Sequence, residues 1–443
     1  MTQAISATSD ALAHAESATT FRKVTARLIP FLFLCYVLNY IDRLNVGFAQ
    51  LHMRSDLGFS DTVYGMGVGL FFIGYLVFEV PSNLLLEKIG ARKTLLRIMV
   101  LWGLASTATM FVSTPVQFYV IRFLVGAAEA GFLPGILLYL TYWYPAAHRG
   151  RITAMFISAL PIAGIIGSPI SGWIMNNMSG VRGLHAWQWL FLLEGIPSVV
   201  VGVIAYFYLQ DGPDKANWLS EQEKALIKRD VEADRRLRES KKQKNFLSAL
   251  RDPKLYVMAL LGFATYWSAN AIAFWAPTII RGTGVSSIAQ VGLLTALPSL
   301  GGLVSMILVG RHSDRTLERR WHAAGAALVS ATALAVLPLF FGSTAGAVAL
   351  LTLCGVGHFA FVAVFWTIPP SYLAGSAAAG GIAAIGAMSA MGGAIVPALL
   401  GWIKTTTGSL GLGMYAISAV LVIAVTVMLL AIPASALKGQ RST

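Results

Sequence analysis

An aspartate and an arginine stand next to each other inside a long apolar stretch. The stretch runs from Leu28 to about Leu51, and residues 39–45 at its centre read Asn-Tyr-Ile-Asp-Arg-Leu-Asn. An apolar run of this length can cross a bilayer as a helix. Each charged side chain near its middle costs roughly 2.5–3.5 kcal/mol on insertion scales. We therefore interpret Asp42 and Arg43 as functional residues.

Four acids and two arginines fall inside predicted helices: Asp42, Glu79, Glu129, Glu194, Arg43 and Arg122. At ~1.5 Å per residue, Asp42 in the first helix and Arg122 in the fourth have matching heights. Glu129 lies on the face of Arg122, about 10 Å lower. We expect Asp42, Arg43 and Arg122 to form one layer above Glu129. The alternative is that these ions only neutralise one another and hold helices together. Glu79 and Glu194 are interpreted as structural.

Charges in this set would couple proton binding to anion binding. With Asp42 and Glu129 ionised, the two arginines are balanced, whereas protonation of both acids leaves two uncompensated positive charges. A carboxylate then restores neutrality, so proton and anion favour each other's binding, which is symport. Importing each negative charge against 100 mV costs ~2.3 kcal/mol. We hypothesise at least two protons for a monoanion.

Aromatic and amide side chains inside predicted helices are candidates to line a substrate site. With Arg43 and Arg122, the candidate substrate contacts are Asn39, Tyr40, Tyr75, Trp267, Asn270 and His358. Aromatic residues in membrane helices also serve as packing or interface anchors, and that alternative stays open for each. A lone His358 is more readily a buried neutral side chain than a proton carrier.

The elements that must position these residues are membrane helices. Of 443 residues, 56% are hydrophobic and only 12% charged, about half the charged share of soluble proteins. Twelve apolar runs long enough to span a bilayer are present. They predict an all-α polytopic membrane protein with two six-helix bundles at 28–209 and 255–433, joined by a cytoplasmic linker at 210–254. Residues 1–27 and 434–443 are expected to be cytoplasmic tails, the first of them disordered.

The distribution of lysine and arginine sets the orientation. Of 33 such residues, 27 fall on the side of both termini and two in the membrane, which leaves Arg54, Arg182, Arg281 and Lys404 on the other side. This bias places both termini in the cytoplasm. The net charge of +13 therefore reflects topology and contact with the lipid bilayer, not nucleic acid. Cys35 and Cys354 lie in apolar runs without further metal-ligand residues, so we expect no disulfide, metal or other cofactor.

Two cytoplasmic segments carry patterned charges. Ser220 and Glu223 have the spacing of a capping box, which predicts a helix in the linker. The loops after the second and eighth helices repeat an acid followed five residues later by a base, at an offset of 227 residues. The pairs are Glu87 with Arg92 and Asp314 with Arg319. We interpret them as a salt-bridged gating latch, although a simple excess of positive charge on the inside is the alternative.

These motifs resemble the major facilitator superfamily. Residues 83–93 resemble its loop 2–3 signature, and Arg122 with Gly126 resembles its RxxxG element on helix 4. Residues 39–45, Glu129-Ala130-Gly131 with Pro134, Trp143-Tyr144-Pro145 and residues 187–195 are similar to the anion:cation symporter family, in particular to bacterial permeases for tartrate, phthalate and hydroxyphenylacetate.

The resemblance implies a function and roles for residues. Helices 1, 4, 7 and 10 would line a central cavity, with Asp42 and Glu129 carrying protons and Arg43 binding the substrate carboxylate. The chain departs from the family at Ile385-Gly386-Ala387, where an asparagine is common, so a smaller or more apolar anion would suit it. We expect a proton-coupled importer of a small organic anion, a mono- or dicarboxylate such as tartrate or an aromatic or hydroxy acid, that works as a monomer in the bacterial inner membrane.

Two alternatives remain. A proton-antiporting exporter of a drug or metabolite would carry a Gly-Pro pair followed by a Gly-Gly pair in helix 5, and residues 167–172 match this pattern only partly. A membrane enzyme or sensor is disfavoured by the sequence, which offers no nucleophile-base pair, metal cluster or phosphate loop.

Overall fold

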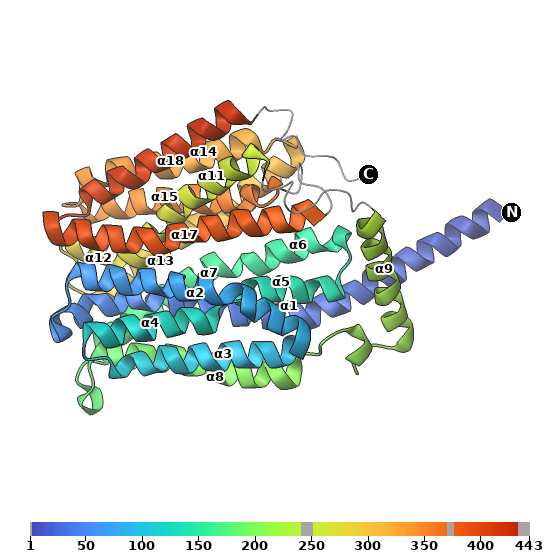
Figure 1. Cartoon of the computed structure of the whole chain (residues 1–443), viewed down its shortest axis with the longest axis horizontal. Helices are drawn as coiled ribbons and strands as arrows, with labels where there is room; N and C mark the ends of the chain where they lie inside the picture. Colours follow the sequence, from blue (N-terminus) through green and yellow to red (C-terminus); the bar gives the residue numbers. More distant parts are fainter. Residues whose placement is uncertain (1, 241–250, 370–375, 433–443) are drawn as a thin grey trace.

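The computed structural model describes residues 2–240, 251–369 and 376–432, and it is all-helical (Figure 1). Within these residues, twelve helical segments are long and apolar enough to cross a membrane, as the sequence predicts. The first six segments form what we call the first bundle, made of α1 (Thr2–Leu57), α2 (Asp61–Ile89), α3 (Ala91–Ala108), α4 (Pro115–Glu129), α5 (Phe132–Trp143), α6 (Ala146–Ile157), α7 (Ala159–Asn177) and α8 (Ala186–Tyr208).

The second bundle follows the linker helix α9 (Glu221–Ser240). It consists of α11 (Pro253–Asn270), the π-helical η4 (Ala271–Trp275), α12 (Ala276–Gly282), α13 (Ile288–Thr316), α14 (Arg320–Val336), α15 (Thr344–Phe365), α17 (Ser376–Thr407) and α18 (Gly411–Ala431). Helices pack mainly within each bundle. The most extensive contacts between the bundles join α2 to α17 and α7 to α13, and α1 makes smaller ones with η4 and α12.

Two of the predicted spans that carry candidate site residues are interrupted, and prolines explain why. The fourth span breaks after Glu129, where Gly131 adopts a left-handed φ of 86° and Pro134 cannot donate to the carbonyl of Ala130. The seventh span contains the π-helical η4. Pro277, just after η4, has no N–H to donate to the carbonyl of Ala273 inside it. Both irregularities lie on helices that carry candidate site residues.

The expectation of a disordered tail up to residue 27 is wrong for this structure. Helix α1 already begins at Thr2, and Thr20, Phe21 and Val24 are buried. Phe21 stacks on Tyr144 with ring centroids 6.0 Å apart, and Val24 is fully buried. The many alanines, serines and threonines of residues 1–20 favour disorder, but Phe21 and Val24 pack against the first bundle and extend the helix.

The linker helix α9 starts with the predicted capping box. The Ser220 backbone N–H donates to Glu223 Oε2 at 2.7 Å, and the Glu223 N–H donates to Ser220 Oγ at 3.2 Å. Lys23 Nζ on α1 donates to Glu223 Oε2 at 2.8 Å, and Arg149 on α6 pairs with Asp234. The linker is therefore attached to the first bundle, while residues 241–250 lie outside the described residues.

We expect this attachment to weaken in acid. Hydrogen bonds from Lys23 hold the pKa of Glu223 below its ordinary value of 4.5. A carboxyl with a lowered pKa stabilises the folded state above its unfolded-state pKa, and this contribution disappears as pH falls through the lower folded-state value. Glu223→Gln should lower the free energy of unfolding by about 0.2–1 kcal/mol at pH 7, as exposed ion pairs do. Thermal unfolding measured from pH 7 to 3 should show this difference shrinking as the pH falls below the ordinary pKa of 4.5; a pH-independent difference would contradict the prediction.

The two bundles meet closely at the end opposite the start of α1 and the end of α18 (Figure 1). A Cβ on Gly65 would lie 2.2 Å from the Pro397 carbonyl oxygen, and one on Gly401 would lie 2.3 Å from that of Asp61. We call this contact between α2 and α17 the glycine seam. Tyr64 Oη also donates to the Phe274 carbonyl in η4 at 3.0 Å. Hydrogen bonds and ion pairs between the bundles cluster at this closed end.

Candidate functional site

Arg43 and Glu129 form an ion pair inside the first bundle. Arg43 Nε donates to Glu129 Oε1 at 2.6 Å, and its Nη2 contacts the same oxygen. The Glu129 side chain is 1% exposed and its Oε2 has no hydrogen-bond partner, whereas Arg43 is 19% exposed. The sequence placed Glu129 below the arginine layer, but that estimate located only backbones. The long Arg43 side chain reaches the carboxylate.

Arg122 is the second buried guanidinium. It is 2% exposed, and its Nε and Nη2 have no hydrogen-bond partner. Its guanidinium carbon lies 5.0 Å from the ring centroid of Phe71, and that of Arg43 lies 5.4 Å from the same ring. Arg43 also lies over the ring of Tyr75, at 5.3 Å. The aromatic faces of α2 thus stabilise both cations without neutralising them.

A glycine positions Arg122 over this ring. A Cβ on Gly126, one turn beyond Arg122 on α4, would lie 1.9 Å from the Phe71 carbonyl oxygen. Gly126→Ala should therefore push α4 away from α2 and lower the free energy of unfolding by about 1–3 kcal/mol, as overpacking does. Thermal unfolding in detergent would measure this, with Gly150→Ala as the control, since a Cβ there meets nothing within 4 Å. Equal stability of the two variants would contradict the prediction.

Asp42 does not join the arginines, which corrects the expected layer. Trp102 Nε1, Ser106 Oγ and Ser198 Oγ donate to its carboxylate at 2.8, 2.9 and 3.0 Å. Asn45 Nδ2 donates at 3.2 Å. Successive residues of a helix point about 100° apart, so Asp42 faces α3 and α8 while Arg43 faces α4. All four recorded donors are neutral.

The other candidates divide into two groups. Asn39 shares the face of Arg43, one turn away on α1, and neither polar atom of its buried side chain has a hydrogen-bond partner. Tyr40 and His358 instead line a separate cavity of about 20 Å³ with Ser299 of α13, a volume sufficient for about one water molecule. His358 Nδ1 is without a partner there.

Trp267 and Asn270 lie on α11, immediately before the π-helical η4. Both are buried, with exposed fractions of 8% and 2%. Asn270 Nδ2 donates to the Tyr266 carbonyl at 2.7 Å, while Asn270 Oδ1 and Trp267 Nε1 have no hydrogen-bond partner. The Asn270 Oδ1 and the Trp267 Nε1–H are therefore available to hydrogen-bond a ligand.

The two copies of the expected latch differ. Asp314 Oδ1 and Arg319 Nη2 pair at 2.8 Å between the ends of α13 and α14. Arg92 does not pair with Glu87 among the described residues. Its Nε donates to the Tyr206 carbonyl at 2.8 Å, and its backbone N–H donates to Asp211 at 3.1 Å. The start of α3 is thus tied to the end of α8 and to Asp211 just beyond it.

Sequence reasoning missed several residues around these groups. Phe71, Trp102, Ser106 and Ser198 are ordinary residues of membrane helices, and only the fold brings them to Arg43 or Asp42. The four-residue spacing of Trp102 and Ser106 did indicate one shared helical face. It did not indicate which face, or which neighbour.

The sequence and the fold both match known proteins. The family model described as Major Facilitator Superfamily matches residues 32–397. The chain is 46% identical over 390 residues to "Putative metabolite transport protein NicT" of Pseudomonas putida, covering 88% of this chain and 89% of that protein. It is 44% identical over 410 residues to a "Putative tartrate transporter" of Agrobacterium vitis, covering 92% and 93%.

Two further matches extend the comparison. The chain is 40% identical over 400 residues to "Quinolone resistance transporter" of Acinetobacter baumannii, covering 90% of this chain and 92% of that protein. The crystal structure of a D-xylose-proton symporter superposes with a TM-score of 0.73 at 17% identity, covering 94% of this chain and 99% of that chain. At that identity the structural match shows the fold alone.

Proposed function

Because this chain belongs to the Major Facilitator Superfamily, a family of multi-pass membrane transporters and not of enzymes, we propose that it imports a small organic anion together with protons. The observation that carries the proposal is the pairing of Arg43 with Glu129 beside a second buried arginine, Arg122. Two guanidiniums face one carboxylate, so the site carries a net positive charge. Such a site favours an anion.

Glu129 is the group that couples the proton to the anion. While it is ionised, it occupies the Arg43 guanidinium with a hydrogen bond of 2.6 Å. A proton on Glu129 removes the negative charge and releases Arg43 for a substrate carboxylate, which can accept two parallel hydrogen bonds. Loss of that proton on the inner side lets Glu129 reclaim Arg43 and expel the anion. Proton and anion therefore raise each other's affinity by the same factor.

Asp42 serves as a second proton position. Its partners Ser106 and Ser198 can accept as well as donate a hydrogen bond, so they can rotate to suit either protonation state. Asp42→Asn is expected to make accumulation depend on one proton fewer, so the steady-state ratio at one unit of ΔpH should fall about tenfold. Labelled-tartrate accumulation against imposed ΔpH would measure this. Normal accumulation by the variant would assign Asp42 a structural role.

The positive-inside distribution supports an orientation in which the closed end faces outward. The termini, the linker and the pair Asp314–Arg319 then lie in the cytoplasm. Alternating access would open the closed end and close the opposite one around the central site. The breaks at Gly131 and η4 are places where the helices could bend during this exchange. Sequence relatives from bacteria support a location in the bacterial cytoplasmic membrane.

The substrate class is a carboxylate of modest size, such as tartrate or an aromatic or hydroxy acid. A relative with a tartrate transporter's name supports the first of these. The site residues beyond the arginines are aromatic or amide, in keeping with a small anion that has few hydroxyls. A monomer contains both arginines and both acids of the site.

Uptake into proteoliposomes tests the proposal. Purified protein should accumulate labelled tartrate or a related carboxylate when the outside is made acidic, and a monocarboxylate also when the inside is made negative; the proton ionophore should abolish accumulation driven by ΔpH. Exchange between equal concentrations on both sides should survive the ionophore. Uptake indifferent to both ΔpH and potential would rule out proton coupling.

Proton-coupled export is a second candidate, favoured by the relative named for quinolone resistance. The same fold and the same Glu129 could exchange a proton for an outgoing molecule. The direction of flux separates the two functions: under an acidic exterior, an importer accumulates its carboxylate inside vesicles of native orientation, whereas an exporter depletes its substrate from them.

A further inference from the structure

A second cationic pocket lies at the closed end, away from Arg43. Its volume is about 450 Å³, within the range of small-ligand sites. The polar residues that line it are Gln50, Arg54, Ser55, Thr278, Arg281 and Lys404. Arg54 and Ser55 end α1, Arg281 ends α12, and Lys404 lies near the end of α17. Both bundles therefore contribute to one pocket.

The charges of this pocket are unusual for this face of the chain. Of the four basic residues that the orientation puts outside, three line the pocket, and only Arg182 does not. No acidic residue is among the lining residues. Asp56, close by in sequence, is already engaged by His185 at 3.0 Å and by Trp187 Nε1 at 3.1 Å. Three cations from distant parts of the sequence thus converge in this pocket, and a single neighbouring carboxylate forms ion pairs with two of them.

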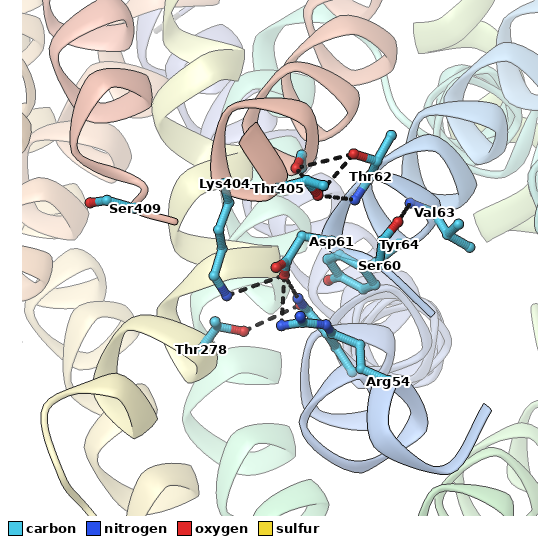
Figure 2. A network of polar contacts seen from close by, with 12 residues as sticks. Arg54, Ser60, Asp61, Thr62, Val63, Tyr64, Thr278, Lys404, Thr405 and Ser409 are labelled. Carbon is cyan, nitrogen blue, oxygen red and sulfur yellow. Dashed lines mark hydrogen bonds and ion pairs between the residues drawn. The ribbon is translucent and has the colours of Figure 1, made fainter. Parts of the chain in front are cut away.

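That partner, Asp61, holds the closed end together (Figure 2). Its Oδ1 pairs with Arg54 Nη1 at 2.8 Å and with Lys404 Nζ at 3.1 Å. Gln50 Nε2 donates to the same oxygen at 3.2 Å, and Thr278 donates to Gln50 Oε1 at 3.2 Å. Asp61 is the first residue of α2, so one carboxylate oxygen links α1 and α2 of the first bundle to α17 of the second.

We propose that this pocket is an outer binding site for the organic anion, and that the anion unlocks the closed end. A carboxylate in the pocket would pair with Arg281 and compete with Asp61 for Arg54 and Lys404. The Nε of Arg54 is buried and has no hydrogen-bond partner, so the guanidinium has a donor to offer. Each contact that the anion takes over is one that no longer joins α17 to α2.

Binding of the substrate in this pocket thereby opens the closed end. In the absence of an anion the pairs of Asp61 favour closure, and they form again once the anion has moved inward to Arg43. The inference rests on the proposed function for the identity of the ligand. It adds a site and a trigger that the central residues do not provide.

Chemical protection of an introduced thiol tests the outer site directly. Ser55 is exposed and lines the pocket, while both native cysteines are fully buried, so Ser55→Cys provides a single reactive thiol. In vesicles of native orientation, a membrane-impermeant maleimide should label it, and external tartrate should slow the labelling more than sodium chloride of equal ionic strength. Succinate would serve as a second dicarboxylate probe.

Four variants in the Ser55→Cys background locate the effect. Arg281→Gln should raise the tartrate concentration for half-protection about tenfold, the value of one charge-assisted hydrogen bond. Arg182→Gln makes the same charge change on the same face outside the pocket and should leave protection unchanged. Arg43→Gln should also keep it, because the central site is separate. Asp61→Asn should lower the half-protecting concentration by at least about threefold, since it removes the competitor of the anion.

The outcomes distinguish this site from the proposed function. Equal protection by sodium chloride, loss of protection in Arg43→Gln, or weaker protection in Asp61→Asn would each overturn the outer site. Thermal unfolding of each variant separates a loss of binding from a loss of folding. If protection follows the expected pattern while no proton-driven uptake is found, the outer anion site stands and the proposed symport fails.

Discussion

Arg43→Gln should lower the rate of carboxylate uptake by one to two orders of magnitude. The change removes the cation that is expected to bind the substrate, and a charge-assisted hydrogen bond is worth about 1.5–3 kcal/mol. The ratio of maximal rate to KM should therefore fall by roughly 10- to 100-fold, with accumulation lost at physiological substrate levels. Initial rates of labelled-tartrate uptake in proteoliposomes would measure the effect. Arg43→Lys, which keeps the charge but not the planar fork, should be intermediate.

Stability has to be separated from binding in this experiment. Without Arg43, Glu129 is a buried carboxylate that has lost its cation, and such a loss costs about 3–5 kcal/mol. The double variant Arg43→Gln, Glu129→Gln removes both charges and should recover most of the thermal stability. It should not recover uptake. If the double variant transports normally, Arg43 is a structural partner of Glu129 and not a substrate ligand.

Glu129→Gln should preserve transport but weaken its coupling to the proton gradient. The amide cannot ionise, so Arg43 stays available to the anion on both sides of the membrane. Exchange of labelled for unlabelled tartrate at equal concentrations should persist. Accumulation driven by ΔpH should fall about tenfold per unit of ΔpH, because one coupled proton is lost while Asp42 still carries the other.

Glu194 provides the matched control for this change. It is another acid buried in a membrane helix, but its Oε1 accepts a hydrogen bond from Ser171 at 2.7 Å, not an ion pair from an arginine. Glu194→Gln should therefore leave the dependence of accumulation on ΔpH unchanged. Equal loss of coupling in both variants would show that any buried acid in this bundle matters and would remove the special role given to Glu129.

The sequence was sufficient to predict where the membrane helices lie and which of them carry the ionisable residues. Apolar length identifies spans because the bilayer core imposes a minimum length. It could not predict the side on which Asp42 and Arg43 find partners. Neighbouring residues on a helix point in different directions, and the donors to Asp42 come from Trp102, Ser106 and Ser198 on two other helices. Only packing decides which faces meet.

The closed end was missed for a different reason. In the sequence, Arg54, Arg281 and Lys404 show only that this side carries few basic residues, and Asp61 lies just outside the apolar run of the second helix. Yet a side of the protein with only four basic residues, of which three converge, is informative once the chain is folded. Counting the charges on one side of the membrane does not show which of them come together in the folded protein.

A proton-coupled carrier lies in the same membrane that maintains the proton gradient, so any proton leak through the carrier dissipates that gradient. Protons hop along files of water, so an imperfectly closed end would discharge the gradient whether or not substrate is present. In the glycine seam, the backbone of α2 lies against that of α17, and the space left for an added methyl group at Gly65 or Gly401 is smaller than a contact distance. At these two positions no water molecule fits between the backbones. If the protein couples to protons as proposed, the absence of side chains here limits proton leakage through the closed end while the carrier is idle.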